Sequence, residues 1–294
     1  MNQVKTGLLL TGLTVILVLM GRWLGGAQGM ILAFVFAIVM NVGSYWFSDK
    51  IVLSMYRAQP VSEAQAPDLY RMVARLCERA NLPMPKLYIV PEPTPNAFAT
   101  GRDPKHAAVA VNEGLLRILD RDEVEGVIAH ELAHVKNRDT LISTVAATIA
   151  GAITMIAHMA RYAAIFGGYG GDRRHRDGDN AIGLLAMAIL APIAALFVQM
   201  WISRTREFEA DRVGGEMCGR PLSLASALTK LERGVTAHPM NAQPATAHMF
   251  IVNPLRGRSF SSFFSTHPST AERVAKLQEL AQKLGSGEPA YTWR

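Results

Sequence analysis

The sequence contains few cysteines and few charged residues. Only two of its 294 residues are cysteines, Cys77 and Cys218, and neither belongs to a C-x-x-C pair. This spacing excludes a disulfide framework and a cysteine zinc knuckle, so we expect two buried, reduced thiols. Although the net charge is +6, no aromatic-basic recognition motif accompanies it, so no nucleic-acid partner is expected. The basic residues lie beside apolar runs, which favours the anionic headgroups of a lipid bilayer as their counterpart.

The apolar residues are concentrated in long runs. Half of the residues are apolar and 18% are charged, and a helix needs about 20 apolar residues to cross a bilayer. No A-x-A cleavage site separates the first two runs, which favours a hairpin of two spans over a cleaved signal peptide. Four spans are therefore predicted, at Gly7–Met20, Met30–Phe47, Leu141–Phe166 and Ala181–Ile202.

These spans divide the chain into four parts. An N-terminal membrane hairpin (1–48) precedes the first soluble part (49–140), and a second hairpin (141–203) precedes the second soluble part (204–294). Because an even number of spans precedes each soluble part, both lie on one side of the membrane. More lysines and arginines flank this side than the other, so the positive-inside rule predicts that both soluble parts face the cytoplasm.

The first soluble part ends in a predicted helix at Arg121–Asp139. Its apolar residues recur at helical spacing, and Asp120 with Glu123 fits a capping box at the helix start. Charged residues at the beginning of this segment argue against a membrane span. We therefore expect an amphipathic helix outside the bilayer.

This helix carries the clearest chemical motif, H-E-x-x-H. His130 and His134 are four residues apart, so their imidazoles project from one face and can bind one Zn²⁺ at about 2.0–2.1 Å. Glu131 lies next to the first histidine, where it can accept a proton from the attacking water. The pattern is typical of zinc metallopeptidases. A helix with two surface histidines and a glutamate is the alternative interpretation.

A third ligand is predicted beyond the last apolar run. A catalytic zinc has three protein ligands and leaves the fourth position to water. Glu207 and Asp211 are four residues apart and share a helical face. We expect Glu207 to be the third ligand of one zinc ion per chain, and Asp211 to fix the tautomer of a ligand histidine. Alone, this segment would be interpreted as an ordinary charged helix.

Four motifs in order resemble the HtpX membrane proteases, which are relatives of the prenylated-protein (CAAX) endopeptidases and of the BepA-like zinc peptidases. In chain order, the motifs are N-A-F-A-T-G at 96–101, H-E-L-A-H-V-K-N-R-D at 130–139, S-R-T-R-E-F-E-A-D at 203–211, and His267-Pro268 with Arg273. The resemblance implies a mainly α gluzincin-like fold with a small β-sheet, joined to four transmembrane helices in two hairpins. It also implies a multi-pass protein of the inner (cytoplasmic) membrane that cleaves misfolded or damaged membrane proteins on the cytoplasmic side, as a stress response.

The resemblance also suggests a substrate-binding edge strand near the active site. An extended substrate can add to such an edge through backbone hydrogen bonds, largely independently of its sequence. A second, strand-like segment at Ala107–Val111 is another candidate for the edge. The first candidate consists of Asn96, Ala97, Phe98 and Ala99.

The C-terminal motif has two interpretations. Arg273 or His267 could assist the transition state, with Arg273 pairing with Asp211. Alternatively, Ser269 and Glu272 fit a capping box that starts the last helix. The preceding stretch, Ala237–Phe264, is either a flap over the cleft or an irregular connection.

Three other functions fit parts of the sequence. A CAAX-type endopeptidase shares the metal centre, but four spans are few for a chamber that holds a prenyl chain. A site-2-like intramembrane protease would carry H-E-x-x-H inside an apolar span, whereas charged residues precede the motif here. A non-catalytic membrane adaptor would hold zinc with a fourth protein ligand, and only three candidates are present.

Overall fold

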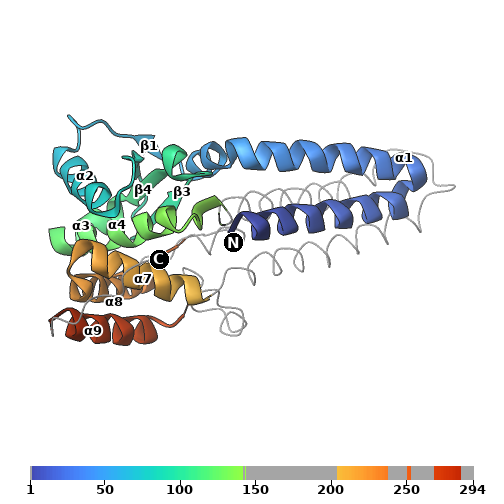
Figure 1. Cartoon of the computed structure of the whole chain (residues 1–294). Coiled ribbons are helices and arrows are strands. Elements are labelled where there is room, and N and C mark those ends of the chain that lie inside the picture. The colour runs from blue at the N-terminus through green and yellow to red at the C-terminus, as the bar shows by residue number, and fades with distance from the viewer. Residues whose placement is uncertain (1, 142, 144–203, 238–249, 253–267, 286–294) are drawn as a thin grey trace.

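The fold consists of a long helical hairpin and an α/β part from which the hairpin extends (Figure 1). It is seen in a computed structural model that describes residues 2–141, 143, 204–237, 250–252 and 268–285. The predicted second membrane hairpin at 141–203 lies almost entirely outside the described residues. The division of the chain at residues 48, 140 and 203 therefore stays a prediction.

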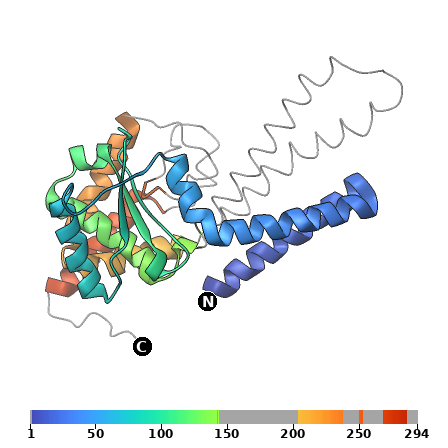
Figure 2. The same cartoon turned by 90° about the horizontal axis from the view of Figure 1, so that it is seen from above.

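The hairpin is formed by α1 (Asn2–Met55), which bends at Gly25 and Gly26. Gly26 has a φ of 60°, a conformation that glycine adopts without steric cost. The two arms of α1 run back along each other in both views (Figures 1 and 2). Between them, the Asn41 side-chain amide donates to the Thr14 hydroxyl at 2.8 Å. A helical hairpin is therefore present where the first two spans were predicted.

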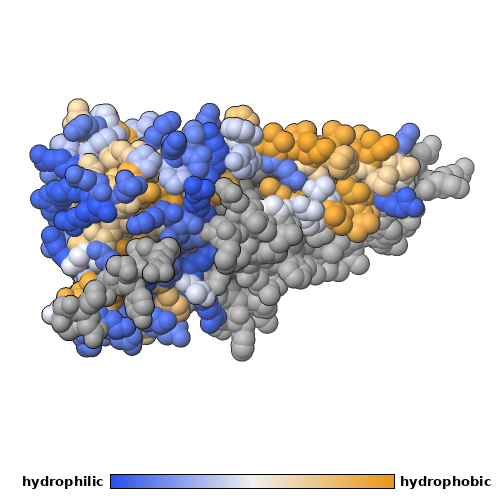
Figure 3. All heavy atoms as spheres, viewed as in Figure 1, coloured by the Kyte–Doolittle hydropathy of each residue, from blue (hydrophilic) through white to orange (hydrophobic). Residues whose placement is uncertain are grey.

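The hairpin has the surface of a membrane-embedded element. By length and hydropathy, one described helix, Gly25–Phe47, can cross a bilayer, and a shorter apolar stretch, Leu10–Leu19, lies in the other arm. Figure 3 shows an apolar surface along the hairpin and a largely hydrophilic one on the α/β part. The number of four spans stays a prediction, because the third and fourth fall outside the described residues.

The α/β part contains a small mixed sheet in the order β1-β2-β4-β3. Its parallel pair is β2 with β4, while β1 pairs antiparallel with β2 and β3 pairs antiparallel with β4. β4 lies in the interior of the sheet, so the prediction of Ala107–Val111 as an edge is wrong. Among the described strands, β3 lies at one edge. The strands are β1 (Gln59–Pro60), β2 (Lys86–Val90), β3 (Ala97–Thr100) and β4 (Ala108–Asn112).

Both faces of the sheet are covered. Because side chains alternate along a strand, Val109 and Val111 of β4 join the main core with the helices, while Ala108 and Ala110 join a smaller cluster with Phe98 and the end of α1. The helices of this part are α2 (Pro67–Ala80), α3 (Glu113–Ile118), α4 (Arg121–Lys136), α7 (Arg204–Cys218), α8 (Pro221–Ala237) and α9 (Thr270–Gly285).

The central helix is α4, which packs against α2, α7, α8 and β3. Its predicted capping box is confirmed: the Asp120 side chain accepts from the Glu123 N–H at 3.0 Å, and the Glu123 side chain accepts from the Asp120 N–H at 2.9 Å. The prediction that this helix is amphipathic is wrong, because every residue from Glu123 to Ala133 is buried. The buried Glu123 carboxylate is neutralised by Lys230 on α8 at 2.7 Å.

Both cysteines are buried free thiols, as predicted. Burial raises the pKa of the Cys77 thiol to about 11, so the thiol stays protonated at neutral pH.

Candidate metal centre

Three potential metal ligands converge between α4 and α7. His130 and His134 come from α4 and Glu207 from α7, with one ligand atom of each within 4.8 Å of the others. The Nε2 atoms of His130 and His134 each lie 3.7 Å from a Glu207 carboxylate oxygen. Ligands arranged tetrahedrally at about 2.0–2.1 Å from one zinc ion are separated by about 3.4 Å. The donor set and its spacing therefore fit a zinc ion with small side-chain adjustments.

Close packing of α7 on α4 brings these residues together. A Cβ atom at Gly214 would lie 2.8 Å from the Cα of His130, so only glycine allows this approach. Asp211 and Glu207 lie about one and two turns before Gly214 on the same face of α7. The face that carries the carboxylates is consequently pressed against the face that carries the histidines.

A buried network surrounds His130. The Asp211 carboxylate lies 3.0 Å from the His130 Nδ1 atom and accepts from the Arg273 Nε and Nη2 atoms at 2.7 and 2.6 Å. Arg273 also donates to the Ile251 carbonyl oxygen at 2.7 Å. Burial lowers the pKa of His130, and the neutral ring is the form that binds a metal. Burial alone would raise the pKa of Asp211, but Arg273 and His130 hold it below its usual value.

Glu131 lies directly beside the sheet edge. Its carboxylate is buried and accepts from the Ala99 N–H of β3 at 2.8 Å. Burial raises the pKa of Glu131 to about 7. A carboxylate with a pKa near neutrality can both take and return a proton. The predicted base and the predicted edge strand are thus in direct contact.

The predicted edge residues lie where β3 begins. Ala97, Phe98 and Ala99 belong to β3, and Asn96 precedes it. The Asn96 side-chain oxygen accepts from the Ile251 N–H at 3.1 Å. Ile251 belongs to a short described piece, 250–252, of the stretch predicted as a flap or connection. This piece therefore contacts both the start of β3 and Arg273.

The C-terminal capping box is present. The Glu272 N–H donates to the Ser269 hydroxyl at 3.2 Å, and the Ser269 N–H donates to the Glu272 carboxylate at 3.0 Å. This box starts α9 and fixes the turn from which Arg273 reaches Asp211. The capping box and the pairing of Arg273 with Asp211 are therefore both present. A role of Arg273 in the transition state stays a prediction, and His267 lies outside the described residues.

Asp139 is a site residue that the sequence reasoning missed. Its carboxylate lies 3.3 Å from the His134 Nδ1 atom and 3.8 Å from the Arg206 Nε atom. Burial alone would lower the pKa of His134, but Asp139, Glu207 and Glu131 together raise it to about 9. The available signal was its position five residues after His134, just beyond the helix.

Known proteins with similar sequences identify the family of this chain. Residues 63–281 match the model of peptidase family M48. The chain belongs to this family. A "Protease HtpX homolog" of Desulfatibacillum aliphaticivorans is 56% identical over 98% of this chain and 93% of its own length. Another, of Pyrococcus furiosus, is 55% identical over 96% of this chain and 97% of its own length.

These relatives confirm the resemblance to the HtpX proteases. This chain, as a member of family M48, is accordingly a membrane-associated metalloendopeptidase. Its fold is also similar to that in the "Crystal Structure of S. mikatae Ste24p", with a TM-score of 0.53 at 20% identity. That match covers 94% of this chain but only 65% of the other, so it supports the fold alone.

Proposed function

We propose that this M48 peptidase binds one zinc ion through His130, His134 and Glu207, and cleaves peptide bonds with Glu131 as its general base. The observation that carries the proposal is the convergence of these three donor groups beside a buried carboxylate. When bound, zinc lowers the pKa of a water molecule toward about 7 and polarises the scissile carbonyl.

The protein residues supply the proton transfers. Glu131 accepts a proton from the attacking water as the new C–O bond forms, and then gives it to the amine as the C–N bond breaks. Its pKa of about 7 suits both steps. Asp211 holds the ring of His130, and Arg273 holds Asp211. In this proposal Arg273 acts by positioning other groups, and His267 remains a candidate for assisting the transition state.

The substrate is an extended segment that adds to β3. At the end of the β3–β4 pair, the Asn112 N–H donates to the Asn96 carbonyl oxygen at 2.9 Å. Hydrogen bonding to the neighbouring strand alternates from one residue to the next. The backbone N–H and C=O groups of Ala97 and Ala99 therefore point away from β4, and the Ala99 N–H donates to the Glu131 carboxylate. Backbone pairing at this edge would select an unfolded chain rather than a particular sequence.

We further propose that the substrates are misfolded or damaged membrane proteins, cleaved at the cytoplasmic face of the inner membrane in protein quality control. Two observations support this. The Gly25–Phe47 stretch of α1 is long and apolar enough to cross a bilayer. Such a span would hold the α/β part at the bilayer surface, where juxtamembrane segments can reach the site. The excess of lysines and arginines on the side of the soluble parts favours a cytoplasmic orientation.

The test is cleavage of two matched membrane substrates by the full-length protein reconstituted in vesicles. One substrate carries a folded domain after its span, and the other carries a destabilised variant of that domain. Cleavage of the destabilised substrate alone, lost in Glu131→Gln, is expected. Equal cleavage of both substrates would contradict selection for unfolded chains, and selective cleavage of a farnesylated peptide would favour a CAAX-type activity instead.

A further inference from the structure

A cavity of about 870 Å³ lies where the hairpin joins the α/β part. It is separate from the metal centre, since none of the residues that line it is a proposed ligand or the proposed base. Its walls come from both arms of α1, the turn after α2, and the loops at 101–105 and 138–141. The lining combines apolar side chains with cations, namely Leu10, Tyr45, Leu141, Arg102, Lys105 and Arg138.

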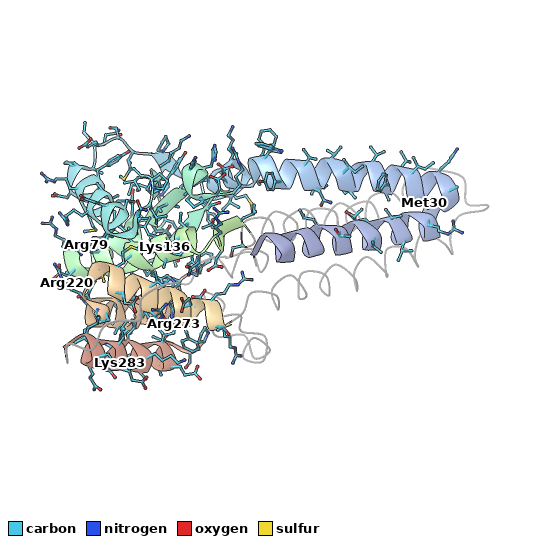
Figure 4. All side chains as sticks on the ribbon, viewed as in Figure 1. Met30, Arg79, Lys136, Arg220, Arg273 and Lys283 are labelled. Atoms are coloured by element: carbon cyan, nitrogen blue, oxygen red, sulfur yellow. The ribbon has the colours of Figure 1, made fainter. Side chains whose placement is uncertain are left out.

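The cavity lies at the height expected for lipid headgroups. The bilayer-crossing stretch of α1 ends at Phe47, and tyrosine and tryptophan are enriched at membrane–water interfaces. Tyr45 and Trp46 are both exposed there, and the Arg102 guanidinium lies 4.7 Å from the centre of the Trp46 ring. In Figure 4, Met30 marks the opposite end of the hairpin. The cavity therefore opens at the end of the span that adjoins the soluble part.

The cavity carries an excess of positive charge. Its carboxylate, Asp103, already accepts from the backbone N–H groups of Lys105 and His106 at 2.9 and 3.0 Å, and lies 2.8 Å from the His106 ring. Arg102 lies 3.6 Å from the same carboxylate. Within the described ranges, neither Lys105 nor Arg138 has a carboxylate at ion-pair distance. Two cations consequently remain to attract an anion.

The two basic loops are fixed relative to each other. The Thr140 hydroxyl donates to the Gly101 carbonyl at 2.9 Å, which joins the loop of Arg138 to the loop of Arg102. Gly101 has a φ of 126°, and a Cβ atom there would lie 2.2 Å from the His106 carbonyl oxygen. The cations are thus presented by a preorganised backbone, which reduces the entropic cost of binding.

We propose that this cavity binds the phosphate group of an anionic phospholipid. Arginine and lysine are the side chains that bind phosphate oxygens, and Arg102, Lys105 and Arg138 surround one site. Leu10 and Tyr45 continue this site onto the apolar surface of the hairpin, where acyl chains can lie. A free phosphate ion could use the cations but not the apolar wall. The proposal rests on the membrane insertion of α1 and is independent of the catalytic residues.

Lipid retention by the full-length protein tests this assignment. The protein is placed in nanodiscs of phosphatidylcholine with a minor fraction of phosphatidylglycerol, and the lipids retained after mild detergent extraction are counted by native mass spectrometry. The test variant combines Arg102→Gln, Lys105→Gln and Arg138→Gln. The control removes three cations from α2, α3 and α9, distant from the hairpin, through Arg71→Gln, Arg117→Gln and Lys283→Gln.

Wild type and control should retain phosphatidylglycerol. The test variant should bind it at least about 25-fold more weakly, since each of the two cations without a carboxylate partner contributes about a factor of five to the attraction. Lys105→Glu alone, at an exposed position that leaves folding intact, should also weaken retention. Equal loss in test and control variants would overturn the site, as would displacement of the lipid by inorganic phosphate at equal concentration. Failure of the wild type to insert into nanodiscs would contradict membrane insertion itself, whereas normal insertion without lipid retention would overturn the cavity alone.

Discussion

Removing one member of the ion pair between Arg273 and Asp211 should destabilise the protein far more than removing both. The two side chains are each 2% exposed and share hydrogen bonds of 2.7 and 2.6 Å. Arg273→Met leaves a buried carboxylate without its cation, which costs about 3–5 kcal/mol. For a protein of this size, each kcal/mol lowers the melting temperature by about 2–4 °C. The expected decrease in the apparent Tm is therefore about 6–20 °C.

The double variant Arg273→Met/Asp211→Leu should recover part of this loss. Replacing both members of a buried pair by apolar side chains is close to neutral. The lost contacts to His130 and to the Ile251 carbonyl cost about 1 kcal/mol each. We therefore expect a net loss of about 2 kcal/mol, measured by thermal unfolding in detergent with a chelator present, so that metal loss does not contribute. If the two single losses simply add in the double variant, the pair is not energetically coupled and the reasoning is refuted.

Two further predictions concern the walls of the metal centre. Gly214→Ala should lower stability by about 1–3 kcal/mol and weaken zinc binding, because its Cβ would meet the His130 backbone. Gly215→Ala should be milder, because the nearest atom to its Cβ is the end of the flexible Leu280 side chain. A thermal shift and a zinc titration of both variants compare them, and equal effects would contradict the packing. Asp139→Asn should weaken zinc binding about 10–100-fold through the loss of the carboxylate beside His134; an unchanged zinc affinity by competition with a chelating dye would exclude this role.

The sequence predicts those features that depend on local spacing. Two histidines four residues apart must share a face once a helix forms, and the capping boxes at Asp120 and Ser269 depend on residues only three positions away. The pairing of Glu207 with the histidines is not local. It was predicted because the chemistry of zinc requires a third ligand and because the order of the motifs resembles a known family.

The features that sequence reasoning missed depend on three-dimensional neighbours. The strand-like composition of Ala107–Val111 predicts a strand but not its place in the sheet, which β2 and β3 determine by pairing on both sides. From the sequence alone, Glu123 indicates a solvated helix face. In the structure it is buried, because Lys230 on another helix neutralises its charge. Asp139 reaches His134 because Arg138 adopts a φ of 58° after the helix ends and turns the chain back. None of these contacts produces a periodic pattern in the sequence from which it could be predicted.

The central claim is one zinc ion held by His130, His134 and Glu207, with Glu131 as the base. Zinc content and cleavage of an unfolded reporter, measured together on detergent-purified wild type, Glu131→Gln and Glu207→Ala, test it most directly. We predict one zinc per chain in the wild type and in Glu131→Gln, loss of zinc in Glu207→Ala, and loss of cleavage in both variants. Retained zinc in Glu207→Ala, or zinc-dependent cleavage by Glu131→Gln, would contradict it.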